Sequence, residues 1–175
     1  MTREEFNALA LSYLEEITSF ARRLTGNAAN ADDLVQATFE RAFEGWRRLR
    51  KSAACRAWLF RIARNLFLDG RRASAVRSQM SLAVDSETSP PAFIVPAEVV
   101  ERLTARELEA ALGRLPEDQR EALLLCDLWG FRYAEIAEIV GSPIGTVRSR
   151  IARARSRVSA LLGKTARETE DRSKR

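Results

Sequence analysis

Apolar residues recur at intervals of three and four along most of the chain, and this helical spacing constrains the fold more than any other feature. The first such run covers residues 6–24, between a possible capping box of Thr2 and Glu5 and a glycine stop at Gly26. No segment shows the strict alternation of apolar and polar residues that marks a half-buried strand. The pattern therefore predicts an all-α fold.

The same spacing predicts the remaining helices. A second helix is expected after an N-cap at Asn30, with Asp32 and Asp33 in its first turn, where carboxylates favour the helix dipole. A third is expected over roughly 53–75, followed by helices over about 103–115, 117–129, 133–140 and 144–162. Pro116 is expected where the 117–129 helix begins, because its missing N–H costs little there, and Gly130 is expected at the end of that helix. The apolar face of the second helix would consist of Leu34, Val35, Phe39, Ala42, Phe43 and Trp46.

The helical pattern is interrupted in the middle of the chain. Residues 78–100 are rich in Ser, Thr, Asp and Pro, and they show no sustained period, which predicts a flexible linker. We therefore expect two small helical domains, over residues 1–77 and 101–163, with a charged tail at 164–175.

The basic residues are concentrated in two blocks. The chain has 29 Lys and Arg against 24 Asp and Glu, a formal net charge of +5. Residues 50–77 alone carry a net charge of +7, and residues 142–160 carry +5 with no acid, while residues 81–101 hold acids and no base. Two such blocks predict two contacts with one polyanion, because each phosphate neutralised by Lys or Arg releases condensed counterions. The alternative is that each block is a solvated helix face.

Histidine is absent from the sequence, which excludes several kinds of chemistry. A histidine general base, a histidine-activated nucleophile and a histidine-containing zinc site are all impossible. No Gly-rich phosphate loop, metal-ligand cluster or catalytic carboxylate pair is visible, so neither an enzyme nor a cofactor is expected. Cys55 and Cys126 are expected to be packing residues. The two lone cysteines, and the lack of a signal-peptide pattern or a membrane-spanning stretch, predict a cytoplasmic setting.

A helix-turn-helix is predicted over residues 133–158. Gly141 would supply the turn, Ser142 the N-cap of the second helix and Pro143 a first-turn position. Small residues and arginines on the outward face suit a helix that enters the major groove of DNA. A helical hairpin with a solvated face is the alternative, but it leaves five arginines in one helix unbalanced by glutamate. The buried faces would consist of Ile136, Ala137 and Val140 on the first helix, and Ile144, Val147, Ile151, Ala154 and Val158 on the second.

Several longer motifs resemble a known family. The strings LPEDQR at 115–120, GFRYAEIA at 130–137 and GTVRSRI at 145–151 look like region 4 of a bacterial RNA polymerase sigma factor. Upstream, ADDLVQATF at 31–39 and AWLFRIARN at 57–65 resemble region 2. Two such regions joined by a short linker are similar to the plan of the extracytoplasmic-function (ECF) sigma factors.

The resemblance implies a polymerase-binding surface in region 2, which would dock on the clamp helices of the largest catalytic subunit. The alternative is that its apolar members are merely core residues, and the polar pair Asp33 and Gln36 discriminates between the two interpretations, since a core has little use for either. The residues implied are Asp33, Leu34, Val35, Gln36 and Phe39.

The resemblance also implies two DNA contacts. The −10 element would be captured as its strands separate, with Asn65 facing a flipped base and arginines on the freed backbone. Trp58 is the member of this group that could instead be a core anchor. The residues implied for the −10 element are Trp58, Phe60, Arg61, Arg64 and Asn65, and those for the −35 element are Thr146, Arg148, Ser149, Arg150 and Arg153.

Taken together, the resemblance implies a dissociable transcription initiation factor, monomeric when free. It would bind core RNA polymerase, direct it to promoters with −35 and −10 elements, assist melting of the −10 element, and be held inactive by an anti-sigma factor. One alternative is a stand-alone repressor or activator, which would need to dimerise and gives no reason for the region 2 motifs. Another is a sigma-like decoy for an anti-sigma factor, which the arginines in both basic blocks disfavour.

Overall fold

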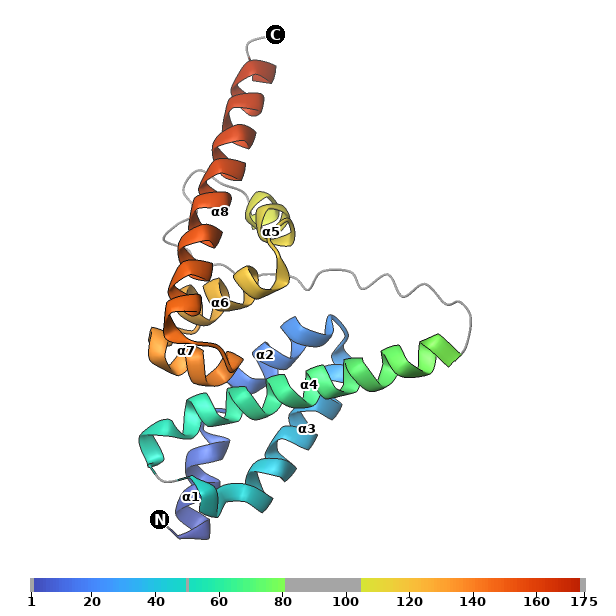
Figure 1. Ribbon diagram of the computed structural model, residues 1–175, viewed down its shortest axis with the longest axis vertical. Coiled ribbons are helices and arrows are strands. Elements are labelled where there is room, and N and C mark those ends of the chain that lie inside the picture. The colour runs from blue at the N-terminus through green and yellow to red at the C-terminus, as the bar shows by residue number, and fades with distance from the viewer. Residues whose placement is uncertain (1, 50, 81–104, 174–175) are drawn as a thin grey trace. The chain divides into compact units, whose positions relative to one another are not determined.

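The computed structural model describes residues 2–49, 51–80 and 105–173, and every regular element within these ranges is a helix (Figure 1). The all-α expectation is thereby confirmed. The chain divides into two compact units, residues 1–91 and residues 92–175. Most of the expected linker lies outside the described residues, although residues 78–80 still belong to a helix. The domain boundaries expected from the sequence stay a prediction.

The first unit contains α1 (Arg3–Leu11), α2 (Leu14–Thr25), α3 (Ala28–Gly45), two short 3-10 turns at Trp46–Arg48 and Ser52–Ala54, and α4 (Cys55–Met80). The capping box of Thr2 and Glu5 is confirmed, and Gly26 ends α2 in a left-handed conformation with φ of 66°. The expected single helix over 6–24 is wrong, because the chain turns at Ser12 and Tyr13, where the Ser12 hydroxyl donates to the Leu9 carbonyl at 2.7 Å.

The start of α3 also differs from the expectation. Asn27, not Asn30, is its N-cap, and the Asn27 side chain accepts a hydrogen bond from the backbone N–H of Asn30 at 3.2 Å. Either asparagine could cap a helix. Asn27 is the N-cap because its backbone is extended, whereas Asn30 already lies inside the helix. As a result Asp32 and Asp33 lie beyond the first turn.

Aromatic residues from several helices build the core of the first unit. Phe6 of α1 is wholly buried and has Phe43, Trp46 and Trp58 around it, with ring centroids 6.0–6.2 Å away. A second pair joins α2 to α4, where the ring centroids of Phe20 and Phe60 are 4.7 Å apart. Burial of such large rings contributes strongly to the packing of the four helices.

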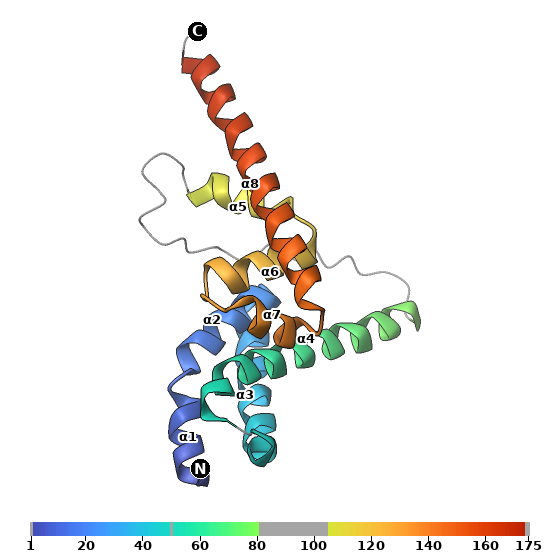
Figure 2. The ribbon, with the colours of Figure 1, turned by 60° about the vertical axis from the view of Figure 1, so that its left-hand side comes forward.

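The second unit contains α5 (Ala105–Gly113), α6 (Glu117–Asp127), α7 (Tyr133–Val140) and α8 (Ile144–Ser173). Both views show α5, α6 and α7 gathered against the lower half of α8 (Figures 1 and 2). Pro116 lies where α6 was expected to begin and is its N-cap residue, with ψ of 142°. Gly130 follows α6 with φ of 66°, a left-handed conformation that suits glycine. The helix expected over 144–162 extends to Ser173.

The core of this unit lies between α6, α7 and α8. Its wholly or almost wholly buried apolar side chains come from all three helices. The apolar face of the helix-turn-helix expected from the sequence is therefore covered by α6. Ile139, which the sequence analysis left out of the buried face, is 1% exposed. The apolar side chains of this unit that are at most 1% exposed are Ala122, Leu125, Ile136, Ile139, Val147, Ile151 and Ala154.

Candidate functional site

The turn of the helix-turn-helix begins at Gly141, whose φ of 64° places it in the left-handed region. The backbone N–H of Ser142 then donates to the Ala137 carbonyl at 3.1 Å, which closes α7. The Pro143 carbonyl accepts from the N–H of Val147 at 3.1 Å, so Pro143 is the residue from which α8 starts. The expected arrangement, with Ser142 as N-cap and Pro143 inside the helix, is therefore wrong by one residue.

The Ser142 side chain serves a different purpose. Its hydroxyl accepts a hydrogen bond from Nη1 of Arg150 at 3.2 Å, and Nε of the same guanidinium lies 2.9 Å from Oδ2 of Asp118 on α6. Arg150 was expected to contact the −35 element. Its guanidinium instead connects α8 to the turn and to α6, because both partners lie within its reach inside the unit.

Two further arginines of α8 are engaged with α6. Arg155 forms an ion pair with Asp127, Nη2 to Oδ1 at 2.5 Å, and this hydrogen bond raises the pKa of Arg155. Nη1 of Arg157 donates to Oε1 of Gln119 at 3.1 Å, and this satisfies an amide that is only 8% exposed. The basic charge of α8 is thus partly balanced by polar residues of another helix.

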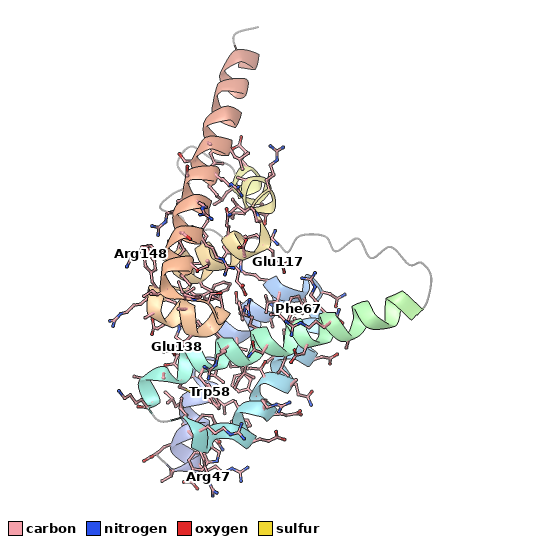
Figure 3. All side chains as sticks on the ribbon, in the orientation of Figure 1. Arg47, Trp58, Phe67, Glu117, Glu138 and Arg148 are labelled. Atoms are coloured by element: carbon pink, nitrogen blue, oxygen red, sulfur yellow. The ribbon has the colours of Figure 1, made fainter. Side chains whose placement is uncertain are left out.

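The remaining two arginines of this block are exposed. Within the described part of the chain, Arg148 and Arg153 have neither a hydrogen bond nor an ion pair, and Arg148 projects outward from α8 (Figure 3). Thr146 and Ser149 are half-buried beside them, and the Ser149 hydroxyl donates to the Thr146 carbonyl at 2.9 Å. Gly145 and Ala152 are exposed on the same helix. Small residues allow a DNA duplex to approach the helix closely, and unpaired guanidinium groups can bind its phosphates or base edges.

The surface predicted on α3 separates into a buried and an exposed part. Leu34 and Phe39 are 8% and 6% exposed, so they belong to the core, where Leu34 packs with Ala21 and Ala31. Val35 is half-buried against the same cluster. The structure thus leaves Asp33 and Gln36 as the members of this group that face solvent.

Two acidic residues that sequence reasoning missed extend this exposed part. Glu40 accepts a hydrogen bond from Nε2 of Gln36 at 2.9 Å, and Glu44 lies one turn further along α3. The spacing of Asp33, Gln36, Glu40 and Glu44 by three, four and four residues was the signal that could have found them. We call these four residues the α3 acidic stripe.

The residues predicted to contact the −10 element also divide. Arg61 and Asn65 are exposed one turn apart on α4, and Arg64 is half-buried. Phe60 is 0% exposed, so its predicted contact with DNA is wrong for this conformation, because the ring fills the core against Phe20. Trp58 is half-buried against Phe6, which makes it the core anchor that the sequence analysis left open.

The two cysteines are free and lie in different units. Cys55 is 0% exposed, and burial raises the pKa of its thiol to about 11. Cys126 is half-buried, and burial followed by the neighbouring Asp127 carboxylate raises the pKa of its thiol as well. Both thiols are therefore protonated near neutral pH, which lowers their reactivity.

Among the described residues, no group of three or more metal-ligating side chains is close enough to hold an ion. None of the helices that the structure describes is long and apolar enough to cross a membrane.

Comparison with known families identifies both units. Residues 9–77 match the family described as Sigma-70 region 2, and residues 105–158 match Sigma-70, region 4. The ECF RNA polymerase sigma factor EcfG of Rhodopseudomonas palustris (strain TIE-1) is 40% identical over 155 residues, which cover 87% of this chain and 82% of that protein. The ECF RNA polymerase sigma-E factor of Escherichia coli (strain K12) is 33% identical, with 89% and 85% covered.

Solved structures agree with this result. The sigma factor RpoE from Bartonella quintana, crystallised with the anti-sigma factor NepR, superposes with a TM-score of 0.73 at 34% identity, covering 91% of this chain and 98% of that one. CnrH in complex with the cytosolic domain of CnrY has a TM-score of 0.62 at 26% identity, covering 93% and 90%.

A region 2 unit followed by a region 4 unit defines a protein of the sigma-70 class. Within that class, the chain belongs to the ECF family of RNA polymerase sigma factors.

Proposed function

We propose that this chain binds core RNA polymerase and directs promoter-specific initiation, with region 4 on the −35 element and region 2 on the −10 element. The observation that carries the proposal is the division of the arginines of α8. Arg150, Arg155 and Arg157 are engaged with α6 or the turn, while Arg148 and Arg153, on the second helix of a helix-turn-helix, are exposed and have no hydrogen bond or ion pair among the described residues. The protein would act by contact alone, in the cytoplasm, while the polymerase performs the chemistry.

At the −35 element, Arg148 and Arg153 would bind guanine edges or phosphates, and Thr146 and Ser149 would offer hydroxyl groups. An arginine that contacts guanine through O6 and N7 contributes about 1–3 kcal/mol of discrimination. Arg150 would act indirectly, as a positioning residue that holds the recognition helix against α6.

At the −10 element, Arg61, Arg64 and Asn65 would contact the separated strand. Extruding one base from the duplex costs a few kcal/mol of stacking and pairing free energy. Contacts of arginine with the freed backbone, and a polar side chain such as Asn65 for an extruded base, offset that cost. The one-turn spacing of Arg61 and Asn65 on α4 allows both contacts on one face.

The polymerase would dock on the α3 acidic stripe. Asp33 and Gln36 are exposed, while Leu34 and Phe39 are buried and Val35 is half-buried, so a partner meets mainly carboxylates and an amide there. Such a surface suits a basic, hydrogen-bonding partner face.

Control by an anti-sigma factor is part of the same proposal. Two similar structures, those of RpoE and CnrH, are complexes with NepR and with the cytosolic domain of CnrY. An inhibitor that covered the faces used for polymerase would keep this chain inactive until a signal removed it.

The rival function is a dimeric repressor or activator that binds its operator without polymerase. Gel filtration of the free chain, followed by titration with core polymerase, distinguishes the two. The proposal expects a monomer that co-elutes with core polymerase in a one-to-one complex. A stable dimer that binds DNA tightly and ignores polymerase would refute it.

A further inference from the structure

Ile144, the first residue of α8, is exposed although the sequence pattern placed it in the buried face. Among the described residues, the large apolar side chains that face solvent are Leu11, Leu14 and Ile144, at 51%, 42% and 46% exposed. Ile144 is the one that lies on the helix-turn-helix. It escapes burial because it precedes the first residue of α8 that packs inward, Val147, which is 0% exposed.

The next residue, Gly145, points to a partner outside the fold. Its φ is not positive, and a Cβ added there would meet no atom within 4 Å. Neither backbone conformation nor internal packing therefore requires glycine at this position, although glycine is a poor helix former. A close approach of another molecule to the backbone of this turn would require it.

The neighbouring side chains favour DNA as that molecule. Arg148 follows Ile144 by four residues, so the two side chains are neighbours on the helix surface, with Cβ atoms about 5–6 Å apart. In helix-turn-helix proteins the N-terminal residues of the second helix contact base edges. The thymine methyl group is the apolar feature of the major-groove edge, and apolar side chains contact it.

We propose that Ile144 is a specificity-determining residue that contacts the methyl group of a thymine in the −35 element, with Gly145 allowing the backbone to approach. The inference rests on the proposed function and adds a residue and a base to it. Because the Cβ atoms of Ile144 and Arg148 lie about 5–6 Å apart and base pairs stack at about 3.4 Å, we expect this thymine within two base pairs of the nucleotide that Arg148 contacts.

The test combines removal of the thymine methyl group from the DNA with truncation of the Ile144 side chain. Holoenzyme selects its promoter from a library, and each −35 thymine of either strand is then replaced singly by deoxyuridine, which lacks the methyl group. Wild-type holoenzyme should bind the deoxyuridine duplex about fourfold more weakly at one position, the effect of one buried methyl group. With Ile144→Ala, thymine and deoxyuridine at that position should bind equally.

Leu11→Ala is the matched control, since it truncates a similarly exposed side chain in the other unit and should leave the wild-type ratio unchanged. Gly145→Ala should keep or raise the melting temperature and yet weaken binding of the selected −35 duplex severalfold. A −35 element without a thymine, or a methyl effect that persists in Ile144→Ala, would overturn the inference. Promoter-specific transcription by wild-type holoenzyme in the same preparation would show that the proposed function nonetheless holds.

Discussion

Arg150 of α8 and Asp118 of α6 form an ion pair, Nε to Oδ2 at 2.9 Å, in which the arginine side chain is 25% exposed and the aspartate side chain 47%. The same guanidinium donates to Ser142 in the turn. One side chain thus connects α8, the turn before it and α6, which packs against α8. Arg148, two residues earlier, points outward.

This difference predicts that two similar substitutions change stability by unequal amounts. Arg150→Ala should lower the free energy of unfolding by about 1 kcal/mol, because a partly exposed ion pair and a hydrogen bond are lost together. Arg148→Ala, which removes an exposed and unpaired side chain, should change it by less than about 0.5 kcal/mol. Urea unfolding followed by circular dichroism measures both, and equal losses would contradict the assignment of Arg150 as a positioning residue.

Substitutions of the arginines should affect the affinity for promoter DNA in a different order from their effects on stability. Arg148→Ala and Arg153→Ala should each weaken binding of promoter DNA by holoenzyme by about 1–3 kcal/mol if the arginine contacts a base. If the contact is to a phosphate, the magnitude of the slope of log K against log salt should fall by about 1. Arg157→Ala, on the same helix but engaged with Gln119, is the control for loss of charge. Binding that depends on neither Arg148 nor Arg153 would mean that the recognition face is misplaced.

The α3 acidic stripe should control the affinity for polymerase. Replacing Asp33 and Gln36 together by Ala should weaken binding to core polymerase at least tenfold, because both side chains are exposed and a buried interfacial polar contact contributes more than 1 kcal/mol. The helical circular dichroism spectrum should be unchanged. Glu15→Ala removes an exposed carboxylate from α2 and should bind normally. Undiminished co-purification of the double variant would place the docking surface elsewhere.

Cys55 should make the fold sensitive to alkaline pH. Burial raises the pKa of its thiol from 9.0 to about 11, so the folded protein holds this proton more tightly than the unfolded chain does. The associated stabilisation is fully present below about pH 9 and is lost as the pH rises towards 11. Cys55→Ala should therefore show a shallower fall in stability than wild type across this interval, and other titrations cancel in the difference. Parallel stability curves would exclude ionisation of Cys55 as a contributor.

Much of the fold follows from the sequence because helical periodicity is a local signal. The capping box of Thr2 and Glu5 and the left-handed stops at Gly26 and Gly141 are confirmed for the same reason. The errors arise where two neighbouring residues compete for one role, as Asn27 and Asn30 do at the start of α3. They also arise where no pattern distinguishes a turn from a helix, as at Ser12 and Tyr13.

The candidate site was harder to predict, because tertiary partners decide which side chains remain available. The five arginines of α8 lack acids on their own helix, but Asp118 and Asp127 of α6 balance two of them. Nothing in the spacing of α8 alone separates Arg148 from Arg150. Phe60 likewise belongs to a family motif, and its burial against Phe20 follows from how α2 and α4 pack.

Run-off transcription by core polymerase tests the central claim most directly. Templates from the selected promoter are transcribed with and without this chain, intact or with either the −35 or the −10 element scrambled. A transcript of defined length should require the chain and the intact promoter, and scrambling either element should reduce it at least tenfold. Transcription that is indifferent to the chain, or to both elements, would contradict the assignment of this protein as a promoter-specificity factor.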